Sequence, residues 1–136
     1  MRIRSAAVVV RDHEVLVIRR EQDGRRYCVL PGGGVERSET LRQACRRELL
    51  EETGLDGTVG ELLDTPVDSE VPVAYFAVRV DSATVGLALG GPELGRASEH
   101  NRYTPHWVPV DALEAMTLVP DEARIAVQLV LGRHGA

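Results

Sequence analysis

The sequence predicts a mixed α/β (α+β) domain in which a mixed β-sheet packs against helices. Three observations predict it: several runs are rich in β-branched residues and bounded by turn signals, a capped helical segment covers residues 40–54, and a second helical segment lies near the C-terminus. The order strands, helix, strands, helix, with several hairpins, favours a sandwich over a repeating βαβ fold. At 136 residues, the chain is expected to form a single domain over residues 1–136.

The first part of the chain predicts three strands. Residues 3–10 are expected to form a buried strand, "VLVIRR" (15–20) a second and "YCVL" (27–30) a short third. "RDHE" turns the chain between the first two strands, which predicts a hairpin, and Asp23-Gly24 is a strong turn signal before the third. A proline and three consecutive glycines then end the third strand, and the glycines are expected to form a loop.

The strongest helix signal begins at Thr40, which is a good N-cap. Gln43, three residues later, completes a capping box. Helix-forming residues continue to Glu52, and Gly54 is well placed to adopt the left-handed conformation that ends many helices.

The second half of the chain predicts further strands, a long loop and a C-terminal helix. "VPVAYFAVRV" (71–80) reads as a strand with which "ATVGLAL" (83–89) could pair, whereas residues 57–64 are ambiguous. Residues 90–105 are rich in Gly, Pro and polar side chains and are expected to form a long, functional loop. A short strand "HWVPV" (106–110), a helical turn "DALEAM" (111–116) and a helix from Asp121 to Leu131, ended by Gly132, complete the prediction.

The composition excludes several classes of protein. A net charge of −5 argues against general binding to nucleic acid or to anionic membranes. All 16 basic residues are arginine, so any contact with phosphate must come from guanidinium groups or backbone N–H groups. Cys28 and Cys45 have no CxxC spacing and are expected to be reduced core residues. No run approaches the roughly 18 apolar residues of a membrane span, and nothing resembles a secretory signal, so a cytoplasmic protein is expected.

Three carboxylates, Glu48, Glu51 and Glu52, fall within five positions of the predicted helix. At about 100° per residue they project together from the border of its apolar stripe, where unpaired charge is costly. Arg47 is within reach of an ion pair with Glu51, but one arginine cannot neutralise three acids. A divalent cation such as Mg²⁺ or Mn²⁺ can. The alternative is a solvated acidic helix end, although the macrodipole disfavours anions at the C-terminal end.

The glycine run lies at the other end of this local unit, where bare backbone can approach a metal ion or a phosphate. From Gly33 onward the chain reads "GGVERSETLRQACRRELLEETGL", which matches the Nudix box in full: Gly, five residues, Glu39, seven residues, "REL", one residue, "EE", one residue, "GL". The sequence therefore resembles the Nudix family. "LPGG" before the box and "WVPVDAL" late in the chain extend the resemblance over the domain.

The resemblance implies an αβα sandwich that hydrolyses a nucleoside diphosphate linked to another group. The expected reaction is attack of a metal-activated water on phosphorus, with Mg²⁺ and in some cases Mn²⁺ as the cofactor. By motif position, the implied metal ligands are Glu48, Glu51, Glu52 and the carbonyl of Gly32, and one of the glutamates could also be the base. Arg47 would orient the acids, and Glu39 and Gly33 would lie next to the metal ligands without binding the ion.

Outside the box the sequence offers weaker candidates. Arg19, Arg20, Arg25 and Arg26 flank the turn before the box, and one or two of them could bind substrate phosphates; we take Arg19 and Arg26 as the candidates. Tyr27 could stack on a base. Ordinary surface positions explain these residues too. Glu99 and then His100, in the expected long loop, are candidates for an extra metal ligand or a general base.

We therefore expect a metal-dependent enzyme that cleaves a pyrophosphate bond in a small nucleotide of the nucleoside triphosphate, ADP-sugar or dinucleoside polyphosphate type. No stable nucleic-acid or membrane partner is expected, and the protein would be a monomer or a homodimer. The alternatives are a module that senses a nucleotide without cleaving it and a purely structural domain with a solvated acidic helix.

Overall fold

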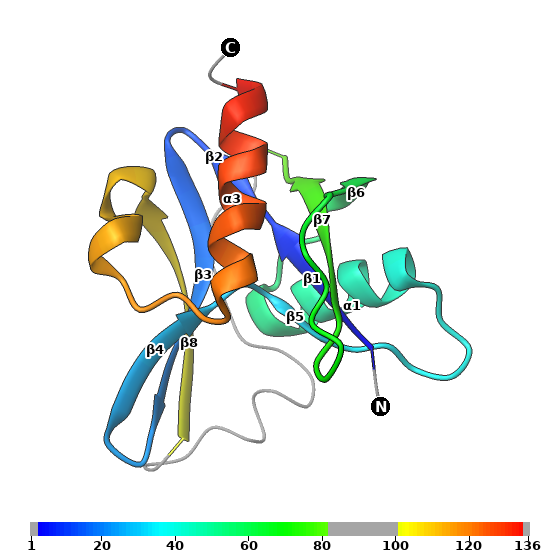
Figure 1. The fold of residues 1–136 in the computed structure, drawn as a ribbon, viewed down its shortest axis with the longest axis horizontal. Helices are drawn as coiled ribbons and strands as arrows, with labels where there is room; N and C mark the ends of the chain where they lie inside the picture. The colour runs from blue at the N-terminus through cyan, green and yellow to red at the C-terminus, as the bar shows by residue number, and fades with distance from the viewer. Residues whose placement is uncertain (1–2, 82–100, 135–136) are drawn as a thin grey trace.

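The computed structural model describes residues 3–81 and 101–134 (Figure 1). In chain order the elements are β1 (Arg4–Val8), β2 (Val10–Arg11), β3 (Glu14–Gln22), β4 (Arg25–Val29), β5 (Gly32–Gly34), α1 (Leu41–Thr53), β6 (Thr58–Leu62), β7 (Val73–Arg79), β8 (Asn101–Pro109), the 3₁₀ helix η1 (Val110–Ala115) and α3 (Asp121–His134). The predicted mixed α+β fold is confirmed. The expected strand at 83–89 lies outside the described residues.

The strands form two sheets. The first has the order β5-β1-β7-β6, in which β1 and β7 are parallel and the other pairs antiparallel. In the second, β3 pairs antiparallel with β8, β4 and β2. The expected hairpin between the first two strands is therefore small: only β2 pairs with β3, whereas β1 pairs with β5 and β7.

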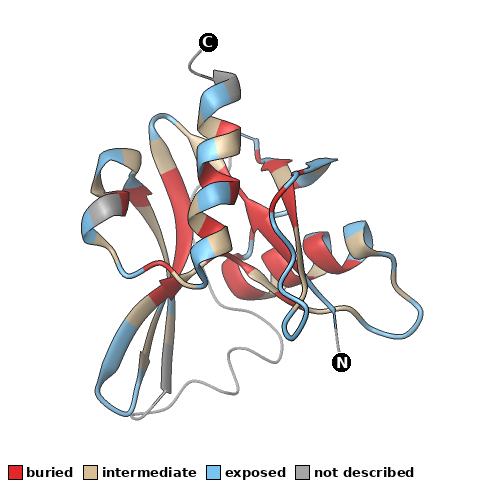
Figure 2. Ribbon diagram, viewed as in Figure 1, coloured by how far each residue is buried: buried red, intermediate tan, exposed pale blue. Residues whose placement is uncertain are grey.

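Two hydrophobic cores lie on opposite faces of β1 (Figure 2). Ala6 and Val8 belong to the core covered by α3, and Ala7 belongs to the core that packs against α1. Alternate residues of a strand point to opposite faces, so β1 serves both cores and reads as a continuous apolar run. Cys28 and Cys45 are free and buried, one in each core, as expected.

Both ends of α1 form as the sequence predicts. The Thr40 side chain accepts a hydrogen bond from the Gln43 backbone N–H at 3.1 Å, and the Gln43 side chain accepts one from the Thr40 N–H at 2.8 Å. Gly54 follows the helix with a left-handed φ of 77°. The predicted turn at Asp23-Gly24 also forms, with φ of 50° and 83°.

Three expectations are wrong. The glycine run forms the strand β5 rather than a loop, residues 101–105 begin β8 instead of ending a loop, and α3 continues past Gly132 to His134. Pro105 is tolerated in β8 because it faces Ile18 at a position whose backbone nitrogen points away from β3, on the edge of the sheet. The ambiguous segment 57–64 contains β6. No helix in the described ranges has the length and apolar character that crossing a membrane requires.

Candidate functional site

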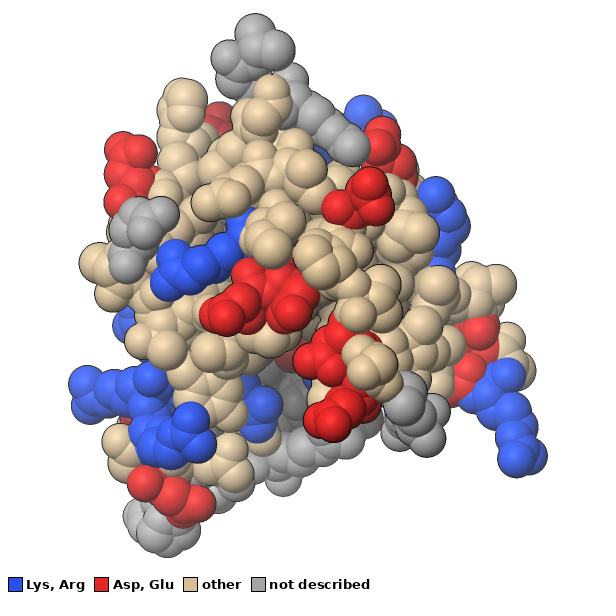
Figure 3. Space-filling model, in the orientation of Figure 1, with Lys and Arg blue, Asp and Glu red and all other residues tan. Residues whose placement is uncertain are grey.

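A cavity of about 630 Å³ opens beside the C-terminal half of α1. Its walls come from β1, β5, α1, the strands β3, β4 and β8, the segment 66–73 and the start of α3. Six carboxylate and three arginine residues line it, a formal net charge of −3 among the described residues: Glu36, Glu48, Glu51, Glu52, Asp68, Glu122, Arg4, Arg20 and Arg47. Figure 3 shows acidic side chains near the middle of the face on which this cavity lies.

The three box carboxylates that the sequence singles out all line this cavity. Glu48 and Glu52 are buried, with exposed fractions of 8% and 6%, and the Glu51 side chain is 25% exposed. The helical periodicity that predicted a common side for them is therefore seen in the structure. Their burial argues against a merely solvated helix end.

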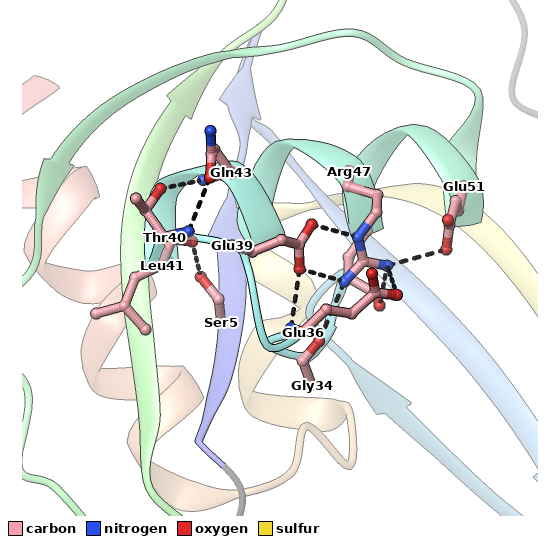
Figure 4. A network of polar contacts seen from close by, with 10 residues as sticks. Ser5, Gly34, Glu36, Glu39, Thr40, Leu41, Gln43, Arg47 and Glu51 are labelled. Carbon is pink, nitrogen blue, oxygen red and sulfur yellow. Dashed lines mark hydrogen bonds and ion pairs between the residues drawn. The ribbon is translucent and has the colours of Figure 1, made fainter.

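Arg47 is the hub of the polar network around these acids (Figure 4). Its guanidinium donates two hydrogen bonds to Glu39, at 2.6 and 2.9 Å, and further bonds to Glu48 at 2.8 Å and Glu51 at 3.3 Å. It also donates to the Gly34 carbonyl at 3.1 Å. These interactions, chiefly those with Glu39, raise the pKa of Arg47 above its ordinary value, so it carries a permanent charge.

Glu39 ties this network to the turn before the helix. Its carboxylate accepts a hydrogen bond from the Glu36 backbone N–H at 3.0 Å while it binds Arg47 with both oxygens. A bidentate pair of this kind fixes the plane of the guanidinium. The guanidinium of Arg47 is thereby held beside Glu48 and Glu51 of the helix.

The strand β5 presents bare backbone to the acids. Its register with β1 places the Gly32 N–H and C=O on the edge that faces away from β1. The Gly32 N–H donates to Glu52 Oε1 at 2.7 Å. A side chain at Gly33 would overlap the Glu48 carboxylate in its present position, so a larger residue there would displace Glu48. The Gly32 carbonyl therefore lies on the same edge of β5 as the Gly32 N–H that binds Glu52.

The donor set suits a hard divalent cation, because it consists of carboxylates and a backbone carbonyl. In the conformation seen, Glu48 and Glu51 face Arg47 and Glu52 faces the Gly32 N–H. Across the described ranges, no three Asp, Glu, His or Cys side chains converge as a metal site. These residues fit an ion once glutamate side chains rotate away from their protein partners.

The substrate-binding residues predicted from the sequence do not line the cavity in its described part. Arg19 and Arg26 lie on the face of the second sheet opposite to Arg20, and Arg26 forms an ion pair with Glu21 at 3.1 Å. Arg20 lines the cavity, whereas Arg19, Arg26 and Tyr27 are not among its described lining residues. Glu99 and His100 lie outside the described residues, and their roles stay predictions.

Two tyrosines, Tyr75 and Tyr103, also line the cavity. Tyr103, on β8, is not identified from the sequence because its segment is expected to be a loop. Tyr75 on β7 is buried, and burial first, then the charge of Glu122, raise its pKa to about 12 against the effect of Arg4. Alternation along the predicted strand 71–80 puts Tyr75 and Phe76 on opposite faces, and in the structure Tyr75 is on the face that lines the cavity.

Comparison with known proteins agrees with the fold and the motif. The family model described as NUDIX domain matches residues 1–129. An ADP-ribose pyrophosphatase of Methanocaldococcus jannaschii is 42% identical over 57 residues, which are 41% of this chain and 34% of that protein. A CTP pyrophosphohydrolase of Escherichia coli is 43% identical over 58 residues, 41% of this chain and 43% of that protein. These matches span less than half of either relative.

The fold is also found among solved structures. A crystal structure of the MutT protein from Methanosarcina mazei Go1 superposes with a TM-score of 0.67 at 23% identity, and the match covers 99% of this chain and 96% of that one. At this identity the likeness concerns the fold.

Proposed function

The chain belongs to the NUDIX family, and from that premise we propose that it hydrolyses a pyrophosphate bond in a nucleoside diphosphate linked to another group, with a divalent metal ion. The two relatives are named for pyrophosphate cleavage, one with ADP-ribose and one with CTP. A small nucleotide-type substrate is the common element of these names, and it is what we propose for this chain.

The observation that carries the proposal is the charge of the cavity. Its described lining residues have a formal net charge of −3, and a pyrophosphate compound brings more negative charge. Two like unit charges 4 Å apart repel by about 4 kcal/mol near a protein surface. A nucleotide therefore needs added positive charge in this cavity, and the oxygen ligands at its wall suit a divalent ion.

The ion would be held by Glu48, Glu51, Glu52 and the Gly32 carbonyl. A bound Mg²⁺ or Mn²⁺ ion supplies charge neutralisation for the phosphates and increases the acidity of a nearby water. One of the three glutamates accepts the proton of the attacking water. No covalent nucleophile is needed for this reaction.

Other residues of the chain position these groups and the substrate. Arg47, held by Glu39, limits the directions in which Glu48 and Glu51 can point. Arg20 and Arg4 line the cavity, which supports a role for them in contacts with phosphate oxygens. We therefore propose Arg20 as a substrate contact in the region where the sequence suggested Arg19, Arg26 and Tyr27.

The test is hydrolysis by the purified protein of a panel of ADP-ribose, CTP, ATP and diadenosine tetraphosphate, each with Mg²⁺, with Mn²⁺ and with a chelator. We expect metal-dependent release of products from at least one compound and none with the chelator. Tight binding of a nucleotide without any product would instead identify a sensing module. Activity that persists with the chelator would refute the metal-dependent mechanism.

A further inference from the structure

A row of arginine and tyrosine side chains runs along the second sheet from the cavity toward the β3–β4 turn. The strand register places Tyr103 on β8 and Tyr27 on β4 directly opposite Arg20 on β3, one on each side of it. Directly paired residues project from the same face of a sheet. Arg25, two residues before Tyr27, shares that face. We call Tyr103, Arg20, Tyr27 and Arg25 the arginine–tyrosine strip.

The members of the strip are in mutual contact. Arg20 donates a hydrogen bond to the Tyr103 hydroxyl at 2.7 Å, and its guanidinium carbon lies 4.3 Å from the centre of the Tyr103 ring. The same carbon is 5.6 Å from the centre of the Tyr27 ring, and the Arg25 guanidinium carbon is 5.9 Å from it. Cations and aromatic rings therefore alternate from Tyr103 to Arg25, within the range of cation–π attraction.

The strip has positive charge available for a ligand. In the described part of the chain, neither Arg20 nor Arg25 forms an ion pair with a carboxylate, whereas Arg26 on the opposite face pairs with Glu21. Figure 3 shows arginine side chains gathered at the lower left of the view, where β3, β4 and β8 lie in Figure 1. This charge contrasts with the acidic wall at α1.

The strip begins inside the cavity and continues outside it. Arg20 and Tyr103 line the cavity, but Tyr27 and Arg25 lie beyond its described lining. Arg25 is two residues beyond Tyr27 on β4, which corresponds to about 7 Å along the strand. Arg25 therefore lies farther from the cavity lining than Tyr27. A compound bound at the acids and long enough to extend beyond Arg20 and Tyr103 would continue onto Tyr27 and Arg25 of the strip.

We propose that the arginine–tyrosine strip binds the second nucleotide of a two-ended substrate, which makes dinucleoside polyphosphates the preferred substrate class. This inference rests on the proposed function, which places the bridging phosphates at the acids of α1. Bases stack on aromatic rings and on guanidinium planes, and both kinds of surface are present here. The two arginines compensate the charge of the additional phosphates.

The test compares hydrolysis of diadenosine tetraphosphate and ATP by the wild-type protein and by Arg25→Ala, Tyr27→Ala and Arg26→Ala variants. The measured quantity is the ratio of kcat/KM for diadenosine tetraphosphate to kcat/KM for ATP. We expect Arg25→Ala and Tyr27→Ala to lower this ratio by about tenfold, the effect of losing one stacking or ionic contact with a base or phosphate. The melting temperature of each variant establishes that it is folded.

Arg26→Ala is the matched comparison, because Arg26 is the neighbour of Arg25 in the chain and projects from the opposite face. A ratio that falls with Arg26→Ala, or that does not fall with Arg25→Ala and Tyr27→Ala, overturns the proposal. If the wild-type protein cleaves neither compound with Mg²⁺ or Mn²⁺ while cleaving others, calorimetric titration decides the matter. Diadenosine tetraphosphate must then bind at least about tenfold more tightly than ATP, and equal affinities overturn the proposal. Absence of hydrolysis of any pyrophosphate compound would be the separate failure of the proposed function.

Discussion

Replacement of Arg47 by alanine should destabilise the protein and disable the site, because this side chain is the charge partner of several buried or half-buried carboxylates. It binds Glu39 with two hydrogen bonds and Glu48 and Glu51 with one each. Without it, Glu48, which is 8% exposed, loses the guanidinium that compensates its charge.

The magnitude follows from burial. Removal of one member of a buried ion pair costs about 3–5 kcal/mol, and the 24% exposure of the Arg47 side chain favours the lower end because water screens part of the loss. A domain of 136 residues has an unfolding entropy of about 0.29 kcal/mol/K, so a loss of about 3 kcal/mol lowers the melting temperature by about 10 °C. Misplaced carboxylates should also lower kcat by about 100-fold.

Scanning calorimetry with and without Mg²⁺ measures the first effect, and initial rates measure the second. Arg46→Ala is the matched control, since Arg46 is the neighbouring arginine and pairs with Asp56 at the surface, at 2.7 Å. We expect little change in melting temperature for this control. Added Mg²⁺ should raise the melting temperature of Arg47→Ala more than that of the wild type, because the ion replaces the lost positive charge. If Arg47→Ala has the same melting temperature as Arg46→Ala and keeps full activity, Arg47 does not organise the site.

Four further changes test other parts of the structure. Glu52→Gln should abolish hydrolysis while the melting temperature stays equal or rises, because glutamine keeps an acceptor for the β5 N–H and removes one of several like charges; retained Mg²⁺-dependent activity would refute the role of this carboxylate. Gly33→Ala should lower kcat about 100-fold by displacing Glu48, and normal rates would show that the glycine is dispensable. Gly132→Ala should stabilise the protein by about 0.5–1 kcal/mol in a denaturant titration, since the helix has open space there; a loss of stability would contradict this. Ultraviolet titration should show the ionisation of a tyrosine near pH 12, and this ionisation should be missing in Tyr75→Phe. The pKa of Tyr75 is higher in the folded than in the unfolded protein. The contribution of Tyr75 to stability is therefore present below the unfolded pKa of about 10 and is lost as the pH rises from about 10 to about 12.

The parts of the site that the sequence predicts are those set by near neighbours. The capping residues of α1 are three positions apart, and the acids of the box are within five. Helical geometry alone then places Glu48 and Glu52 on a common side. The turn at Asp23-Gly24 is equally local, because it depends on left-handed conformations that these two residues adopt readily.

The parts that the sequence does not predict depend on distant partners. The glycines of β5 carry no strand propensity, and they form a strand because they pair with β1, where a side chain at Gly32 would overlap Ser5 and Ala6. Likewise Pro105 reads as a loop residue until β3 is known to lie on the side away from its nitrogen. The sequence did not show which of Arg19 and Arg20 faces the cavity. Residues 15–18 of β3 are buried on both faces, so no alternation of polar and apolar residues marks the face that points to the cavity.

Under the proposed function, Arg47 and a divalent ion would compete for the same oxygens, because Arg47 binds two of the three proposed ligands. In the conformation seen, Arg47 holds Glu48 and Glu51, and the Gly32 N–H holds Glu52. Because Glu39 anchors the guanidinium with two hydrogen bonds, Arg47 would remain in place if Glu48 and Glu51 turned toward the proposed ion. In the conformation seen, each of the three acids has a protein partner, so the proposed site would not depend on a bound ion to compensate them. A lysine at position 47 would lack the planar fork that binds Glu39 with two bonds while it also reaches the helix acids. The geometry around Arg47 thus accounts for an arginine, rather than any cation, at this position of the box.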